Sequence, residues 1–112
     1  MKQIVAIVKP FLAEKVIESI ADQAVKELSV REVKGYGRQK NYLDQYGENE
    51  YSLAFVPKVE ISIWADDQHI SAIVDRIVSV SRTGRLGDGK IMILPAISPI
   101  NISEQASNAS DS

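Results

Sequence analysis

The apolar residues of the chain fall into short blocks whose spacing switches between a strand repeat and a helix repeat. Residues 4–8 form an apolar run that stops at Lys9-Pro10, which is typical of a short buried strand. Pro10 favours the first turn of a helix, because its ring fixes φ and no partner exists there for the missing N–H. From residue 12 to residue 25 apolar side chains recur every three or four positions, which predicts a helix with one buried face.

The second half of the pattern repeats the same kinds of block in a different order. Residues 28–36 alternate and end at Gly35-Tyr36-Gly37, and residues 51–64 regain strand character with a break at Pro57. Helical spacing returns over residues 69–78, where we expect Asp66 or Asp67 as the N-cap. Residues 91–94 close the pattern as a strand. The predicted order is βαββαβ.

This order is that of the split βαβ or ferredoxin-like fold of the α+β class, in which both helices cover one face of a four-stranded antiparallel sheet. On three strands, alternating apolar residues are expected to share one side of the sheet: Val5, Ile7, Ile61, Ile63, Ile91 and Ile93. An apolar sheet face of this extent rarely stays in water. We therefore expect a homo-oligomer whose sheets face inward, with clefts between subunits.

Composition narrows the class of protein. The 112 residues suffice for one small domain, which we place at residues 1–102, followed by a polar tail at residues 103–112 that we expect to be disordered. A net charge of −2 argues against a nucleic-acid partner. No apolar run approaches the roughly 20 residues of a membrane span, and the first residues lack the features of a signal peptide. Without cysteine there is no thiolate metal site. We expect a cytoplasmic protein without membrane insertion.

Residues 83–90, with the sequence TGRLGDGK, carry three glycines and two cations between the predicted second helix and the last strand. Glycines let successive backbone N–H groups converge on one point, and such a nest binds anionic oxygens, above all those of phosphate. A β-turn with exposed cations explains the same residues equally well. The spacing fits neither the Walker loop nor the dinucleotide fingerprint. A nucleotide held here would therefore be held by another fold.

Residues 37–53 form a polar segment that carries three tyrosines and almost no aliphatic side chain. Compact domains seldom keep loops longer than about 12–15 residues without a function. This segment is therefore predicted to contact a partner protein, and a solvated extension of a hairpin is the alternative.

Several motifs in order make the chain resemble the PII signal-transduction family. These are residues 7–11 (IVKPF), 32–40 (EVKGYGRQK), 50–51 (EY), 55–59 (FVPKV) and 83–91 (TGRLGDGKI), and the likeness runs over about the first 100 residues. The resemblance implies a ferredoxin-like homotrimer with a nucleotide site in each intersubunit cleft. It also implies a T-loop at about residues 37–54 that docks on a membrane transporter or a metabolic enzyme, a B-loop at about residues 82–90, and no catalytic residue.

The family's binding residues can be carried over to matching positions of this sequence. Gly87, Asp88, Gly89 and Lys90 would hold the phosphates with Arg38, while Ser29 and Trp64 would lie near the adenosine. The nucleotide-binding residues that the resemblance implies are Ile7, Ser29, Gly35, Gly37, Arg38, Gln39, Trp64, Arg82, Thr83, Gly87, Asp88, Gly89 and Lys90. For the effector it implies Gln39, Lys40 and Lys58, with Gln39 as a ligand of the Mg²⁺ that joins ATP to 2-oxoglutarate. Tyr51 stands where many members are uridylylated.

The tail departs from the family at Asn101 and Ser103, where most members have arginines that contact phosphate. Each charge-assisted hydrogen bond contributes on the order of 1.5–3 kcal/mol, so ATP would lose more than ADP or AMP. Two functions follow. One is a nitrogen sensor that binds ATP, Mg²⁺ and 2-oxoglutarate. The other is a divergent paralogue that senses ADP or AMP with a small anion such as bicarbonate and regulates carbon uptake. A weak ATPase is a third alternative, against which the lack of a histidine or carboxylate base near the phosphates counts. A transporter partner would recruit the protein to the membrane.

Overall fold

The computed structural model describes the backbone of residues 1–40, 51–85 and 87–103, and the side chains of these residues except 36–40 and 51–55. The elements are β1 (Lys2–Val8), a 3-10 turn (Pro10–Leu12), α1 (Ala13–Ser19), β2 (Val25–Lys40), β3 (Tyr51–Ala65), α2 (Asp67–Ser81) and β4 (Gly89–Pro95). They form one sheet in the order β2-β3-β1-β4, in which all pairs are antiparallel. The predicted ferredoxin-like α+β fold is confirmed.

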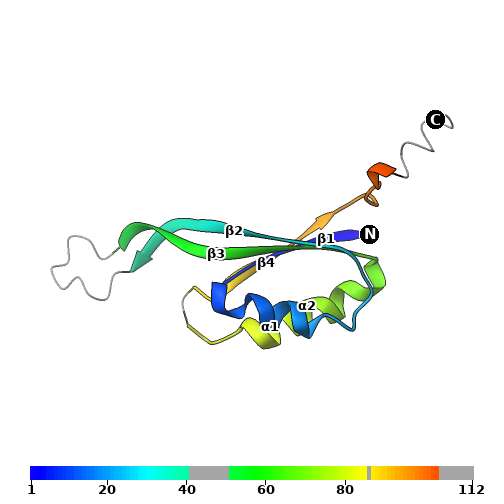
Figure 1. The fold of residues 1–112 in the computed structure, drawn as a ribbon. Helices are drawn as coiled ribbons and strands as arrows, with labels where there is room; N and C mark the ends of the chain where they lie inside the picture. Colours follow the sequence, from blue (N-terminus) through cyan, green and yellow to red (C-terminus); the bar gives the residue numbers. More distant parts are fainter. Residues whose placement is uncertain (41–50, 86, 104–112) are drawn as a thin grey trace.

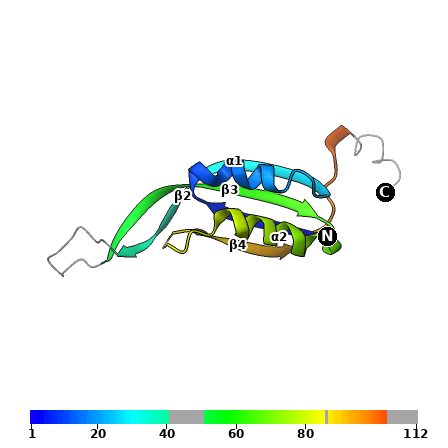
Figure 2. The same ribbon diagram turned by 90° about the horizontal axis from the view of Figure 1, so that it is seen from below.

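Both helices lie on one face of the sheet, as Figures 1 and 2 show from two directions. Between the helices and the sheet lies an aliphatic core in which β1 and β3 are the central strands. The members of this core with at most 2% exposure are Ile4, Ala6, Val8, Val16, Ile20, Ile61, Ile63, Ala65, Ile73 and Ile77. The face of the sheet that lies away from the helices is called the open face below.

The prediction of one apolar row over three strands is wrong, and the pairing register explains why. Ala6 lies opposite Ile61 and Ile91, so these residues point to the helices together. Val5 instead lies opposite Ser62 and Met92 on the open face. On the same face Ile7 lies in one cross-strand row with Glu60, Arg31 and Lys90. The open face is therefore mixed in polarity, so the argument from an apolar sheet face no longer supports a homo-oligomer.

The first helix is shorter than the predicted span of residues 12–25. α1 ends at Ser19, and Val25 already begins β2 opposite Ala65. Arg76 of α2 donates a hydrogen bond to the Ser19 carbonyl at 2.9 Å and another to Asp22 at 3.0 Å. The guanidinium thus satisfies a free carbonyl at the end of α1, and Val25 is partly buried as a member of the sheet. The apolar spacing alone could not distinguish the apolar residues of α1 from Val25 of β2.

Pro57 does not interrupt β3, which runs continuously from Tyr51 to Ala65. Pro57 lies opposite Lys34 of β2, whereas β1 pairs with β3 only as far as Val8 opposite Val59. Beyond that point β3 has a partner on one side only. Proline is tolerated at such an edge because no second strand needs its missing N–H.

β2 and β3 continue past the body of the molecule as a two-stranded ribbon (Figure 1). Residues 37–40, which we expected to belong to the loop, are therefore strand. Residues 51–54, which we expected both in the strand at residues 51–64 and in the T-loop, are strand as well, and Lys40 pairs with Tyr51 at the end of the described ribbon. Residues 41–50 of the expected T-loop lie outside the described residues, as do residues 104–112 of the expected disordered tail.

α2 begins where the spacing predicted, with Asp66 at the N-cap position. The Asp66 side chain makes no capping hydrogen bond and lies 3.6 Å from Lys26, while the Asp67 carboxylate accepts a hydrogen bond from the N-terminal ammonium at 2.8 Å. Both carboxylates therefore tie α2 to neighbouring segments. No helix of the described residues is both long and apolar enough to cross a membrane.

Candidate functional site

The segment between α2 and β4 is shaped by glycines in the left-handed region. α2 ends at Ser81, and Arg82 is already extended with φ −76° and ψ 113°. Gly84 and Gly87 have φ values of 80° and 83°, which L side chains adopt only with strain. This part of the sequence turns here because its glycines permit it. The residues from Arg82 to Asp88 are called the glycine loop below, and its residue 86 lies outside the described ones.

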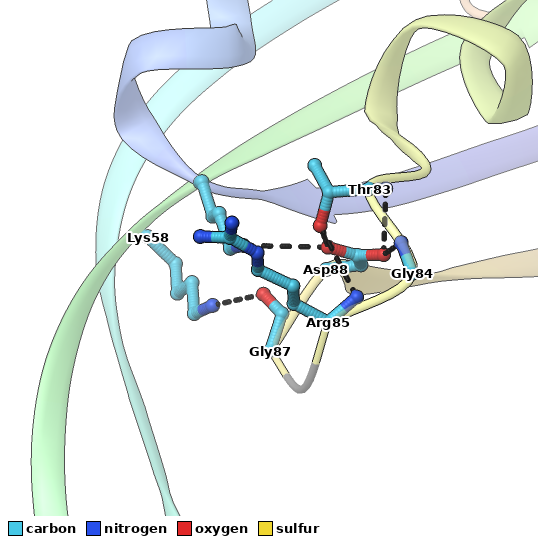
Figure 3. Close-up of polar contacts among 7 residues, drawn as sticks. Lys58, Thr83, Gly84, Arg85, Gly87 and Asp88 are labelled. Carbon is cyan, nitrogen blue, oxygen red and sulfur yellow. Dashed lines mark hydrogen bonds and ion pairs between the residues drawn. The ribbon is translucent and has the colours of Figure 1, made fainter.

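The Asp88 side chain holds the start of the glycine loop in place (Figure 3). Its Oδ2 accepts hydrogen bonds from the backbone N–H groups of Thr83 at 2.8 Å and Gly84 at 2.9 Å. Its Oδ1 accepts a hydrogen bond from the Thr83 hydroxyl. The bond from this hydroxyl, together with the two backbone bonds, holds the pKa of the Asp88 carboxyl well below its usual range. Asp88 is thus ionised at neutral pH and closes the loop onto itself.

Two lysines from other parts of the chain reach the same loop. Lys9, which directly follows β1, places its Nζ 3.3 Å from Asp88 Oδ1. Lys58 of β3 donates a hydrogen bond from its Nζ to the Gly87 carbonyl at 2.8 Å, as Figure 3 shows. Burial lowers the pKa of Lys58, and the positive charge of Lys9 lowers it further. The sheet therefore presents two ammonium groups to a loop that holds one carboxylate.

The glycine loop leads into β4 through a close contact with β1. At Gly89, which has φ 116°, a Cβ would lie 2.0 Å from the Ile7 carbonyl oxygen. Only glycine allows the two strands to come this close. Lys90 then lies opposite Ile7, so that an exposed cation and the Ile7 side chain share the open face beside the loop.

The predicted site residues with described side chains fall into two separate sets. Ile7, Lys58 and the glycine loop form the first set. Ser29 and Trp64 form the second, since Ser29 is exposed on β2 opposite Ser62, and Trp64 lies two positions farther along β3. Trp64 stands four residues from Glu60, the residue opposite Ile7, which is a separation of ~13 Å along the strand. One chain brings the first set together but does not bring the second set to it.

The stem of the β2–β3 ribbon adjoins the first set. At Gly35 a Cβ would come within 3.3 Å of Lys58 Cγ, so the missing side chain leaves room for the lysine beside the ribbon. Gly37, Arg38, Gln39 and Lys40 continue β2 in register with Ala54, Leu53, Ser52 and Tyr51. The side chains of these eight residues lie outside the described part of the structure, and so do the roles predicted for Arg38, Gln39, Lys40 and Tyr51.

Two features of this region were absent from the sequence prediction. Lys9 was treated as the end of a strand, and nothing in the sequence indicates its contact with a residue 79 positions away. Arg31 donates a hydrogen bond to Glu60 at 2.6 Å on the open face, in the row that contains Ile7 and Lys90. Only the register of three strands places this ion pair next to the predicted site.

Metal binding by protein side chains alone finds no support in the part of the chain that the structure describes. Among these residues no group of three or more His, Cys, Asp or Glu side chains lies close enough together to hold a metal ion. The Mg²⁺ predicted at Gln39 would share phosphate oxygens of a nucleotide, which is how magnesium is usually bound. That prediction is not tested by the described side chains.

Comparison with known proteins gives matches over nearly the whole chain. The sequence model of the family described as "Nitrogen regulatory protein P-II" matches residues 1–105. A "Nitrogen regulatory protein P-II" of Cereibacter sphaeroides is 46% identical over 102 residues, which are 91% of this chain and 91% of that protein. Over the same shares, "Nitrogen regulatory protein P-II 1" of Escherichia coli (strain K12) is 41% identical, and a "Nitrogen regulatory protein P-II" of Synechocystis is 38% identical.

Proposed function

Since this chain belongs to the nitrogen regulatory protein P-II family, a family of signalling proteins rather than enzymes, we propose that it binds an adenine nucleotide at the glycine loop and signals through the β2–β3 ribbon. The observation that carries the proposal is the closed glycine loop, with Lys58 held against Gly87 and Lys90 exposed beside Ile7. Loops of this kind, rich in glycine and bordered by ammonium groups, suit phosphate oxygens.

The position of Lys58 supports a route from the nucleotide to the ribbon. Lys58 belongs to β3, the strand that leads out to Tyr51, and its ammonium group contacts the glycine loop. A phosphate or an effector carboxylate that attracts this ammonium group competes with the Gly87 carbonyl for it. Ligands would thereby favour one arrangement of the ribbon and of the segment 37–54, and only that arrangement would fit the transporter or enzyme that is regulated.

The separation of the two sets of residues supports a cleft between copies of the chain. Ser29 and Trp64 lie far along the sheet from the glycine loop of their own chain, but a second copy can bring its Ser29 and Trp64 to that loop. We propose a homotrimer with one such cleft per pair of neighbours. In the cleft, the phosphates lie at the glycine loop of one copy, and the adenosine lies beside the open face of the next.

Calorimetry tests the nitrogen-sensor form of the proposal. 2-Oxoglutarate added to protein with Mg²⁺ and ATP should release heat, and it should release none when either Mg²⁺ or ATP is omitted. Lys58→Met, which keeps an unbranched side chain but not its charge, should abolish this second binding event even at ATP concentrations that saturate the variant. Heat from 2-oxoglutarate alone, or no binding of any adenine nucleotide, would contradict the proposal.

Asn101 and Ser103 favour a second candidate function. Both are exposed at the end of the described chain, and neither supplies the cation that most members have there. We therefore propose, as the alternative, a paralogue that senses ADP or AMP together with a small anion such as bicarbonate. In this case ADP and AMP bind no more weakly than ATP. An affinity for ATP about tenfold higher than for ADP would rule out this alternative, because other residues would then replace the two charge-assisted contacts missing at Asn101 and Ser103.

A further inference from the structure

Within the described residues, both oxygens of the Asp88 carboxylate are already engaged by donors of the protein. One oxygen accepts from the N–H groups of Thr83 and Gly84, and the other accepts from the Thr83 hydroxyl and lies 3.3 Å from Lys9 Nζ. These donors face one point and are of the kind that would otherwise bind an anion from solution. The protein's own carboxylate therefore occupies the first part of the nest.

We propose that Asp88 is a positioning residue, which acts as an internal anion and sets the shape of the glycine loop before a nucleotide arrives. The inference rests on the proposed nucleotide site and changes one part of it. The Asp88 side chain does not contact the phosphates. The phosphates then bind at the Gly87–Lys90 side of the loop, beside Lys58 and Lys90.

Two features of the fold support this division of the loop. Lys58 reaches the loop at Gly87, on the far side from Thr83 and Gly84, so a ligand that attracts Lys58 also lies on that side. Gly87 and Gly89 both have positive φ and thus turn their N–H groups in directions that other residues seldom allow. Asp88 stands between these two glycines, so the bonds from its side chain to Thr83 and Gly84 restrain the segment that carries them.

Removal of the Asp88 carboxylate should change the affinity for the nucleotide in the opposite direction to that expected from charge repulsion alone. A carboxylate close to bound phosphate repels it, so removing the charge should strengthen binding if Asp88 acts only through its field. If Asp88 holds the loop, its removal weakens binding, because the loop must then be ordered at the expense of binding free energy. Asp88→Ala removes every one of these contacts. Asp88→Asn keeps one oxygen that can still accept from Thr83 N–H and Gly84 N–H.

The experiment is an ADP titration by calorimetry of the full chain and four variants. We expect Asp88→Ala to weaken ADP binding by at least about tenfold, as lost charge-assisted hydrogen bonds would. Asp88→Asn should fall between Asp88→Ala and the wild type, with and without Mg²⁺. Asp75→Asn, which removes a carboxylate exposed on α2, should bind like the wild type and is the control for net charge. Thr83→Ala removes only the hydroxyl donor and should weaken ADP binding less than Asp88→Ala does. This variant also tests the inference if Asp88→Ala does not fold.

Amide hydrogen exchange of the ligand-free proteins provides a second measurement. Thr83 and Gly84 should exchange faster in Asp88→Asn and Thr83→Ala than in the wild type, while core amides such as that of Ile61 keep their protection. Unchanged or tighter ADP binding by the Asp88 variants would overturn the inference with the nucleotide site intact, and so would a loss that occurs only with Mg²⁺. A wild type that binds no adenine nucleotide would instead remove the proposed function together with this inference.

Discussion

At the scale of single residues, the candidate site depends on positions where one side chain, or the absence of one, determines the path of the backbone. Gly89 allows β4 to approach the Ile7 carbonyl, and Asp88 closes the loop that precedes it. The sequence predicted both positions as part of one glycine-rich segment. It could not show that Asp88 bonds within the loop or that Lys9 joins it, because these contacts link distant residues.

Replacing Gly89 by alanine should be among the more destabilising changes in the chain. The new Cβ would meet the Ile7 oxygen at 2.0 Å, and φ 116° is unfavourable for alanine. We expect the free energy of unfolding to fall by at least about 3 kcal/mol, because strain in the backbone and displacement of β1 add together. Urea denaturation followed by circular dichroism measures this loss.

Gly84→Ala is the matched control for this prediction. Gly84 also has positive φ, at 80°, but a Cβ there would have no heavy atom within 4 Å. Its cost should be only the backbone strain of about 1–2 kcal/mol. If the two variants lose the same free energy, the close approach to Ile7 does not contribute.

At the scale of elements, pairing and tertiary contacts decide where helices and strands end. The apolar spacing located both helices and all four strands, and the expected order βαββαβ is confirmed. The spacing misplaced the end of α1 and the break at Pro57, since these depend on Arg76 from another helix and on where β1 stops. It also placed residues of three strands on the same side of the sheet, whereas the pairing register puts them on opposite faces. A shift of one residue in the register moves every side chain to the other face.

The role of Arg76 at the end of α1 leads to a prediction at this scale. Arg76→Met keeps most of the side chain but removes the donors to the Ser19 carbonyl and to Asp22, and should lower the free energy of unfolding by about 0.5–1 kcal/mol. Asp22→Asn leaves the bond to Ser19 intact and should lose less than Arg76→Met. Equal losses in chemical denaturation would mean that the carbonyl contact adds no stability.

At the scale of the whole molecule, the open face carries residues that one chain keeps apart. Ile7 and Lys58 lie at the end of this face that adjoins the glycine loop, and Ser29 and Trp64 lie farther along it. In the proposed function, a second copy of the chain would bring the two sets together in one cleft. The trimer itself stays a prediction, and so does the cytoplasmic location inferred from the sequence.

Trp64 is the only tryptophan of the chain, so its fluorescence tests the proposed cleft. Saturating ADP should change its fluorescence emission, because adenine bound beside an indole alters the environment of the ring. The midpoint of this change should agree with calorimetry and move to higher ADP concentration in Asp88→Ala. Light scattering should give a molar mass three times that of one chain for the protein that shows this fluorescence change. ADP binding without any change in emission would place the base away from Trp64.

The sequence by itself determined the order of the elements, the family, and the segment that contains the glycine loop. Periodicity and the order of motifs along the chain carry this information, and neither depends on contacts between distant residues. Only the tertiary structure decided which side of the sheet each strand residue takes, how α1 ends, and that Asp88 bonds to its own loop with Lys9 and Lys58 nearby. These features arise from strand register and from packing between segments far apart in sequence, where a shift of one residue reverses the face of every side chain.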